Sequence, residues 1–449
     1  MPAAPAIGLD FGTTNTVLAE RQADGRIAAQ SFVHDNQQFS AFRSVLALWQ
    51  EQTDAGRDTR AEAGAWAIDR FIDDPFDTRF LQSFKTFAAS RAFKNTTIAG
   101  RTYQFEDLLG AFFAKFIAHA NRPRESLPKR LIVGRPVAFA GANPDGALAA
   151  ERYDLAFSRF GFKEVHHVYE PVAAAFYFAQ RLKRDATVLV ADFGGGTSDF
   201  SLIHFALTPQ GIVAKPLAQS GVGVAGDTFD YRIIDAIVSP RLGKGTQYRS
   251  WGKILDVPGH YYANFARWNT LSIMKSQRIL TELKGLARES LDPEKLEALI
   301  AFIDADVGYP LYKVVSEAKI GLSSRTTARL KFAARGVEID QVVQRTDFER
   351  WIARDLERID AAVGAALAKA GMREKQVDKV FLTGGSSFVP AVIHAFEKRF
   401  GKPKIESGDE LVSIAYGLAL IGEEEDIARW TAHVDDGSVL VDADLAVAS

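Results

Sequence analysis

Asp10-Phe11-Gly12-Thr13-Thr14-Asn15 and Asp192-Phe193-Gly194-Gly195-Gly196-Thr197-Ser198-Asp199 are two versions of one pattern, placed 182 residues apart. A short apolar run precedes each of them, residues 6–9 in the first case and 187–191 in the second. An apolar run that ends in a glycine cluster is typical of a buried strand followed by a tight turn. The repeat therefore predicts two similar halves, each presenting an Asp-Phe-Gly turn, with a cleft between the halves if the two turns face each other.

Further elements of the same kind surround these stretches. Residues 130–134 and 379–383 are apolar runs that end in glycine or lead into it, as expected of strands. Apolar residues recur at helical spacing over residues 105–116 and 356–367. Strands that alternate with helices predict an α/β architecture.

The domain organisation follows from the repeat. We expect residues 1–185 to form the first half and residues 186–422 the second half. A mostly helical insertion is predicted at about residues 239–310, where no strand is followed by a glycine turn, and residues 423–449 are expected to form a short C-terminal tail.

The composition narrows the class of protein. The 449 residues carry a formal net charge of −2 and include no cysteine, which excludes disulfides, thiolate metal sites and cysteine nucleophiles. Lys and Arg are not clustered, so nucleic acid is not the expected partner. The N-terminus lacks the pattern of a secretory signal, and no run of about 18 apolar residues could span a bilayer. We expect a soluble, monomeric, cytoplasmic protein with no membrane partner.

The residue types at the two turns point to a magnesium–nucleotide complex. A glycine turn lets backbone N–H groups approach an anion closely, and threonine hydroxyls add further donors. An aspartate at the end of a strand repels phosphate but can hold Mg²⁺, often through water, and the ion then bridges it to the phosphates. The alternative is a pair of ordinary strand-ending turns, but two turns with the same order of residues favour phosphate binding.

Four motifs together resemble the superfamily of actin, hexokinase and the heat-shock-seventy chaperones. Asp10–Asn15 resembles its first phosphate loop, and Asp192–Asp199 resembles the second in its heat-shock form. Tyr169–Ala175 resembles the connecting helix of the chaperones, and Leu382–Pro390 resembles their adenosine motif. The motifs follow the family's order across residues 6–420, and the set is similar to the short YegD-like branch. The resemblance implies a duplicated actin-like (ribonuclease H-like) ATPase fold, with two lobes that each hold a central mixed sheet and flanking helices around a nucleotide cleft.

The resemblance also implies roles for residues on the phosphate side, with ATP or ADP and Mg²⁺ as ligands. The residues implied to cradle the phosphates are Gly12, Thr13, Thr14, Asn15, Gly194, Gly195, Gly196 and Thr197. The residues implied to organise Mg²⁺ and its waters are Asp10, Asp192 and Asp199. The residues implied to take part in the chemistry, by orienting the attacking water and the γ-phosphate, are Lys85, Glu170, Thr197 and Asp199.

A second group is implied to bind the adenosine. Its members are Gly384, Gly385 and Ser386 below the adenosine, Gly226 and Asp227 on the ribose side, and Lys319 and Ser323 beside ribose and adenine. Ile320 and Phe388 stand where many family members have an arginine or a similar group, so the adenine contacts differ from the usual pattern.

Several of these assignments have an alternative based on the residues alone. Lys85 in isolation would more often be a surface lysine, and Lys319 and Ser323 also fit a solvated helix face. Glu170 also fits an acidic residue that a helix N-terminus favours through its dipole.

The function implied by the resemblance is ATP binding with slow hydrolysis that drives a conformational change, in a chaperone-related protein. The sequence ends too soon for the usual peptide-binding domain, so we expect that domain to be lacking, and the insertion at 239–310 is one candidate for holding a client protein or co-chaperone. Two alternatives remain open. One is a small-molecule kinase of the same superfamily, and the other is a nucleotide-dependent actin-like filament or scaffold protein.

Overall fold

The computed structural model divides into two compact units, which are described separately. The residues that it describes are 6–54, 56–75, 77–137, 139, 143–208, 211–267, 271, 274–304, 308–408 and 411–431. Within them, unit 1 comprises residues 6–225, 358–387 and 392–431, and unit 2 comprises residues 226–357 and 388–391. Most of the predicted tail at 423–449 lies outside the described residues.

The first sheet of unit 1 is built around β1 (Ala6–Phe11), which is almost completely buried. Its strand order is β13-β12-β1-β2-β3, with β6 also paired to β2. β1 runs parallel to β12 and antiparallel to β2. The bounds of the other strands are β2 (Asn15–Arg21), β3 (Ile27–Ala29), β6 (Phe42–Arg43), β12 (Arg130–Arg135) and β13 (Glu164–Tyr169).

Aromatic residues fill the core between this sheet and the helices α2 (Phe105–His119) and α3 (Gly146–Ser158). The ring of Phe11, the last residue of β1, lies 5.5 Å from the ring of Phe84 and 5.6 Å from that of Phe112, measured between centroids. Offset and tilted ring pairs of this kind are favourable beyond the area they bury. The carboxyl end of β1, where Asp10 lies, is therefore firmly anchored.

Smaller elements extend the first half of unit 1. β7 (Val45–Thr53) lies between β8 (Gly56–Ala63) and β9 (Thr78–Gln82) in a separate sheet, beside α1 (Gly64–Asp73). Two short hairpins join β4 (Phe32–His34) to β5 (Gln37–Phe39) and β10 (Thr96–Ile98) to β11 (Arg101–Tyr103). The short 3₁₀ helix η1 (Phe84–Phe87) follows β9 and carries Lys85.

The second sheet of unit 1 repeats the pairing of the first. Its order is β16-β15-β14-β21-β22, and β14 runs antiparallel to β15 and parallel to β21, as β1 does to β2 and β12. The bounds are β14 (Ala186–Phe193), β15 (Ser198–Thr208), β16 (Gly211–Val222), β21 (Lys379–Thr383) and β22 (Ile405–Ser407). Two mixed sheets with flanking helices confirm the predicted α/β, duplicated actin-like fold.

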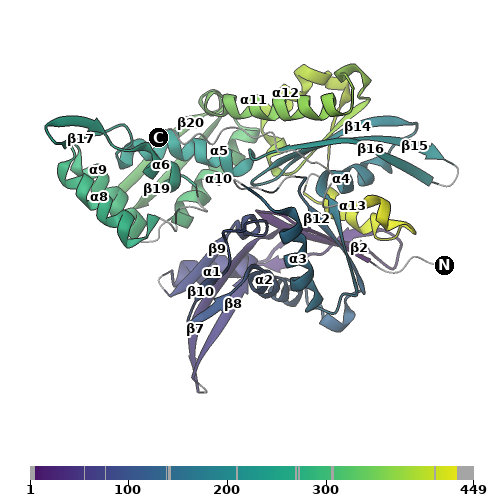
Figure 1. The fold of residues 1–449 in the computed structure, drawn as a ribbon, viewed down its shortest axis with the longest axis horizontal. Helices are drawn as coiled ribbons and strands as arrows, with labels where there is room; N and C mark the ends of the chain where they lie inside the picture. Colours follow the sequence, from purple (N-terminus) through teal and green to yellow (C-terminus); the bar gives the residue numbers. More distant parts are fainter. Residues whose placement is uncertain are drawn as a thin grey trace. The chain divides into compact units, whose positions relative to one another are not determined.

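Two helices lie between the two sheets of unit 1, as Figure 1 shows: α4 (Glu170–Ala179) and α13 (Ser413–Ile421). One apolar cluster joins both helices to Ile132 of the first sheet and Val190 of the second. Main-chain atoms approach very closely here, because a Cβ added to Gly417 would lie 1.8 Å from the carbonyl oxygen of Ala173. A Cβ on Gly8 would similarly lie 2.4 Å from the carbonyl oxygen of Ala415.

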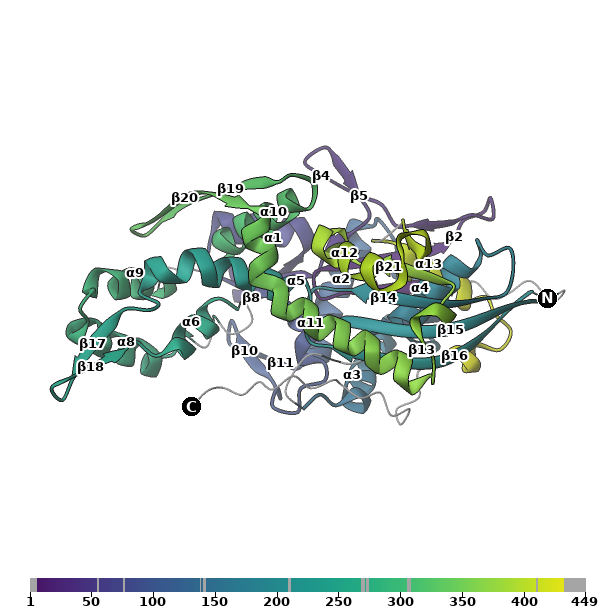
Figure 2. The same ribbon diagram turned by 90° about the horizontal axis from the view of Figure 1, so that it is seen from above.

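The outer face of the second sheet is covered by α12 (Pro390–Phe400) and the C-terminal part of α11 (Arg345–Lys369), which Figure 2 shows from above. The ring of Phe396 lies 5.7 Å from that of Phe193 at the end of β14. The hydroxyl of Ser220 on β16 donates to the carbonyl of Ala362 on α11 at 2.7 Å. These contacts fix the strand end that carries Asp192.

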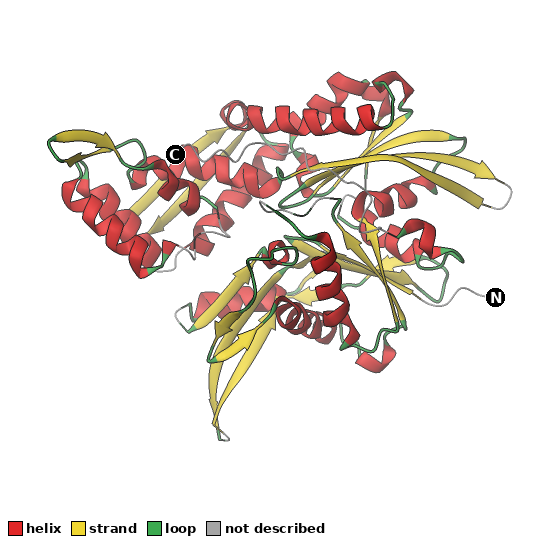
Figure 3. Ribbon diagram, in the orientation of Figure 1, coloured by secondary structure: helices red, strands yellow, loops and turns green. Residues whose placement is uncertain are grey.

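Unit 2 is mainly helical and contains two hairpins, drawn in yellow in Figure 3. Its helices are α5 (Gly226–Ile233), α6 (Gly259–Phe265), α8 (Gln277–Glu289), α9 (Pro293–Asp304), α10 (Gly308–Ser324) and the N-terminal part of α11. Its hairpins join β17 (Gln247–Ser250) to β18 (Lys253–Asp256) and β19 (Thr327–Ala334) to β20 (Val337–Gln344).

The β17–β18 hairpin lies inside the segment that was predicted to be mostly helical. Its turn residues Trp251 and Gly252 have φ angles of 50° and 73°. Two consecutive left-handed residues form the turn that best suits a two-residue hairpin. No helix formed by the described residues is both long and apolar enough to cross a bilayer.

Candidate functional site

The two Asp-Phe-Gly turns have the same backbone geometry. The amide of Gly12 donates to the carbonyl of Asn15, and the amide of Gly194 donates to the carbonyl of Thr197, both at 2.9 Å. A Cβ on Gly12 would lie 2.4 Å from the carbonyl oxygen of Asn15, so the first turn requires glycine at this position. The tips of the turns are formed by Thr13-Thr14 and Gly195-Gly196, which are the residues predicted to meet phosphate.

Four carboxyl groups gather near these turns: Asp10 on β1, Glu170 at the start of α4, Asp192 on β14 and Asp199 on β15. Burial and the charge of Glu170 raise the pKa of Asp10 to about 7, although Lys85 opposes the shift. Burial and the charges of Glu170, Asp10 and Asp199 raise the pKa of Asp192 well above its ordinary value. The structure therefore brings Asp192 within electrostatic reach of the other two predicted metal-binding aspartates, Asp10 and Asp199.

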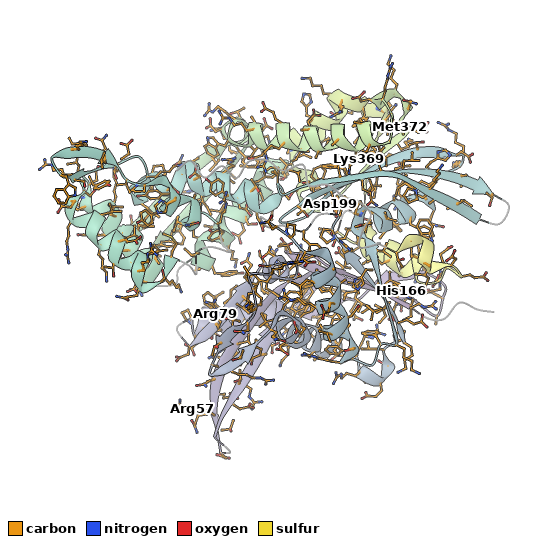
Figure 4. The ribbon with its side chains drawn as sticks, viewed as in Figure 1. Arg57, Arg79, His166, Asp199, Lys369 and Met372 are labelled. Carbon is orange, nitrogen blue, oxygen red and sulfur yellow. The ribbon has the colours of Figure 1, made fainter. Side chains whose placement is uncertain are left out.

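Asp199, which Figure 4 labels, is held by its neighbours on the second turn. It lies directly opposite Asp192 in the β14–β15 pairing. The hydroxyl of Thr197 donates to its Oδ2 at 2.8 Å. Thr197 and Asp199 therefore lie together, and their shared role in the chemistry stays a prediction.

Lys85 and Glu170 form a buried ion pair. The distance from Lys85 Nζ to Glu170 Oε1 is 2.6 Å, and the two side chains are only 7% and 8% exposed. Burial by itself lowers the pKa of Lys85, but the charges of Glu170, Tyr153 and Asp10 outweigh it, so the net shift is upward. Lys85 is therefore a fixed ammonium group beside the aspartates and not a surface lysine.

A buried arginine that the sequence analysis missed fixes the segment carrying Lys85. Arg152 of α3 donates to four carbonyl oxygens in the residues that follow Lys85, at 2.7 to 3.3 Å: those of Phe87, Ala88, Ser90 and Phe93. Hydrogen bonds from a charged donor are stronger than neutral ones. No pattern in the sequence marks Arg152, because one arginine on a helix does not indicate which carbonyls it will meet.

The third glycine stretch packs against the second turn. Gly384 has a φ of 81°, and a Cβ on it would lie 2.2 Å from the carbonyl oxygen of Phe193 and 2.9 Å from Oδ1 of Asp192. The hydroxyl of Ser386 lies 3.4 Å from the carbonyl oxygen of Gly194 and donates to it. The structure thus places the predicted adenosine residues Gly384, Gly385 and Ser386 next to the second phosphate turn.

The remaining predicted residues lie together in unit 2. Lys319 Nζ is 2.8 Å from Asp230 Oδ2 and 3.0 Å from the carbonyl oxygen of Gly226, and its side chain is only 13% exposed. The hydroxyl of Ser323 donates to the carbonyl of Lys319 at 3.4 Å. Burial and the charge of Asp230 raise the pKa of Asp227 to about 6, against the effect of Lys319. The place of this group beside the residues of unit 1 stays a prediction.

The chemistry of the donor set fits a magnesium ion that is held through water and phosphate oxygens. Among the described residues, no three Asp, Glu, His or Cys side chains are placed to hold an ion by themselves. Mg²⁺ typically keeps several waters and takes one or two carboxylates together with substrate phosphates. Its charge would oppose the effects of burial and of neighbouring carboxylates, which together raise the pKa values of Asp10 and Asp192.

Comparison of this sequence with known protein families finds a match to one family. The family model described as Hsp70 protein matches residues 6–245 and 306–436. The residues between these ranges hold β17, β18, α6, α8 and α9 of unit 2.

Two relatives illustrate the similarity. The chaperone protein DnaK of Thermus thermophilus is 23% identical over 447 residues, which cover 94% of this chain and 62% of that protein. The chaperone protein DnaK of Deinococcus proteolyticus is 22% identical over 427 residues, which cover 93% of this chain and 59% of that protein. The chain thus spans about six tenths of the length of the curated relatives it matches.

Proposed function

Because this chain belongs to the Hsp70 family, we propose that it binds ATP with Mg²⁺ and hydrolyses it slowly. The proposal rests on the fact that residues from both turns lie near the same charged groups. The charges of Glu170 and Lys85 act on the pKa of Asp10 in the first turn and on that of Asp192 in the second. Two matching glycine turns beside one cluster of carboxylates and one buried ammonium suit a triphosphate with a divalent cation.

The residues of this chain would act mainly by positioning. Backbone amides at the two turns and the hydroxyls of Thr13 and Thr14 would bind the phosphates, and Lys85 would orient the γ-phosphate and the attacking water. Bound Mg²⁺ would supply charge that neutralises the phosphate oxygens. Glu170 would accept a proton from the attacking water, but its Oε1 already accepts a hydrogen bond from Lys85. We therefore propose slow turnover.

The output of the reaction would be a conformational change. ATP and ADP would stabilise different states of the protein, and each nucleotide can shift the balance only by the difference in its affinity for the two states. A client protein or a co-chaperone would bind one state in preference to the other. The adenosine would be bound by Gly384–Ser386 and by the group around Lys319.

Calorimetry on the full chain tests the binding proposal. We expect saturable binding of ATP and ADP in the presence of Mg²⁺, with much weaker binding in EDTA. Asp10→Asn should reduce the effect of Mg²⁺, whereas Asp58→Asn, at a carboxylate that is 59% exposed on β8, should not. Absence of binding by either nucleotide with Mg²⁺ would refute the proposal.

A turnover assay tests the assignment of the chemistry. Lys85→Met should abolish phosphate release from ATP while nucleotide binding persists, because Lys85 is assigned to the reacting phosphate and not to the adenosine. Unchanged phosphate release by this variant would remove Lys85 from the mechanism.

A further inference from the structure

Arg135 is a buried cation without a complete set of partners. It is the last residue of β12 and is only 6% exposed. Its guanidinium carbon lies 5.1 Å from the ring centroid of Tyr169 and 5.4 Å from that of Phe139. Among the described residues, its Nε has no hydrogen-bond partner and no carboxylate forms an ion pair with it. Stacking on two rings offsets only part of the loss of hydration of a buried charge.

The guanidinium faces the N-terminus of α3. A Cβ on Gly146, the first residue of this 13-residue helix, would lie 2.9 Å from Nη2 of Arg135 and 3.9 Å from Nη1. The peptide dipoles of a helix place partial positive charge at this end. Asp145 caps the helix, but its carboxylate accepts from the amide of Leu148 at 3.0 Å and from Arg91 at 2.7 Å. The guanidinium of Arg135 and the positive end of the α3 dipole thus both lie at Gly146.

This arrangement adjoins the candidate functional site. Gly134, next to Arg135 in the chain, is so close to Glu170 that a Cβ on it would lie 3.1 Å from Glu170 Cγ. The buried hydroxyl of Tyr153, also on α3, has no hydrogen-bond partner in the part of the chain that the structure describes, and the charges of Lys85, Glu170 and Arg135 all act on it. Arg135 therefore lies on the same edge of the first sheet as the Lys85–Glu170 pair.

We propose that Arg135 and the N-terminus of α3 form a binding site for a phosphate-class oxyanion. The fork of N–H groups on arginine matches phosphate oxygens, and a helix N-terminus binds anions through its amides and its dipole. Glycine at position 146 lets the guanidinium of Arg135 lie against the start of α3. Ala147 next to it is exposed, so the site opens to solvent. If ATP is hydrolysed as proposed above, on which this assignment of the ligand rests, the site would hold the phosphate that is released.

Titration of inorganic phosphate into the nucleotide-free full chain, at constant ionic strength, tests the site. We expect saturable binding, with affinity reduced about tenfold or more in Arg135→Met because charged hydrogen bonds are lost. Gly146→Ala should also weaken binding, because its methyl group would displace the guanidinium. Arg101→Met is the matched control for the arginine, since Arg101 also stacks on a ring, that of Tyr103 at 5.3 Å, but lies on β11.

The affinities of Arg135→Met for ATP and ADP show whether the site holds the terminal phosphate of ATP or free phosphate. If the anion is the terminal phosphate of ATP, Arg135→Met lowers the preference for ATP over ADP. If the anion is free phosphate, that preference is unchanged while phosphate binding is lost, and either result supports the site. Wild-type affinity for phosphate and an unchanged preference for ATP in both Arg135→Met and Gly146→Ala would overturn it.

If Arg135→Met does not fold, Gly146→Ala decides, because alanine is more favourable than glycine in a helix; Gly285→Ala on α8, where a Cβ meets nothing within 4 Å, is its control. If the chain binds neither ATP nor ADP, the proposed function fails, but the phosphate titration still tests the oxyanion site.

Discussion

Replacing Lys85 by methionine tests the buried ion pair most directly. Methionine keeps an unbranched side chain but removes the ammonium group, which leaves Glu170 8% exposed and without the cation that now lies 2.6 Å away. Breaking a buried pair by removing one partner destabilises a protein by about 3–5 kcal/mol. Because Asp10 and Asp192 already lie in the field of Glu170, we expect a loss at the upper end of this range at pH 8.

The assay is urea unfolding of four proteins without nucleotide and in EDTA: wild type, Lys85→Met, Glu170→Gln and the double variant. The double variant should lose less stability than the sum of the single variants, by about 2 kcal/mol, because neither partner is then left as an unpaired buried charge. The loss in Lys85→Met should be smaller at pH 6 than at pH 8, because Asp10, with a pKa of about 7, is protonated at pH 6 and repels Glu170 less.

Additive losses of unfolding free energy in the single and double variants would refute the proposed coupling of Lys85 and Glu170. If the two single losses sum to the double loss within about 0.5 kcal/mol, the pair is not energetically coupled. Glu170 would then not be the group that holds Lys85 in place beside the reacting phosphate. Lys94→Met, at an exposed lysine, is the control and should change the free energy of unfolding by less than about 0.5 kcal/mol.

Arg152→Met should lower the free energy of unfolding by about 3 kcal/mol, because carbonyls that now accept from a buried cation lose their donor; an unchanged melting temperature would contradict the role given to this residue. Gly384→Ala should lower the free energy of unfolding by more than about 2 kcal/mol, since its methyl group would lie 2.2 Å from the carbonyl oxygen of Phe193, whereas Gly385→Ala should leave the melting temperature unchanged. Without nucleotide or Mg²⁺, stability should fall between pH 6 and pH 8, because the pKa of Asp10 is raised to about 7 in the folded protein. The stabilisation from its proton is complete below the unfolded pKa and is lost as the pH rises through 7, with a slope of at most about 1.4 kcal/mol per pH unit. Asp10→Asn should flatten this slope in pH-dependent thermal melts, and an unaltered slope would argue against the shift.

The parts of the site that are local in sequence could be predicted from the sequence. A strand, an aspartate and a glycine turn occupy a few consecutive residues, and the matching hydrogen bonds of Gly12 and Gly194 follow directly from that order. Lys85 differs, because it pairs with a residue 85 positions away. Only resemblance to a family suggested its role, since no local pattern distinguishes a buried lysine from a surface one.

Residues that act through long-range contacts could not be predicted. Arg152 and Arg135 look like ordinary polar positions, and their burial depends on which strands and loops the fold brings to them. The β17–β18 hairpin was missed for another reason. The aromatic and β-favouring residues around Trp251-Gly252 were treated as part of a helical segment, although a glycine in such a dipeptide also favours a hairpin turn.

The layer formed by α4 and α13 has a consequence for how the two sheets of unit 1 can respond to each other. At Gly417 and Gly8 the nearest atoms across the contact belong to main chains. A change of rotamer can absorb a small displacement in most protein interiors, but here there is none to change. A shift of the first sheet at Gly8 must therefore carry α13 along with it, and α13 must in turn carry α4 through the contact at Gly417.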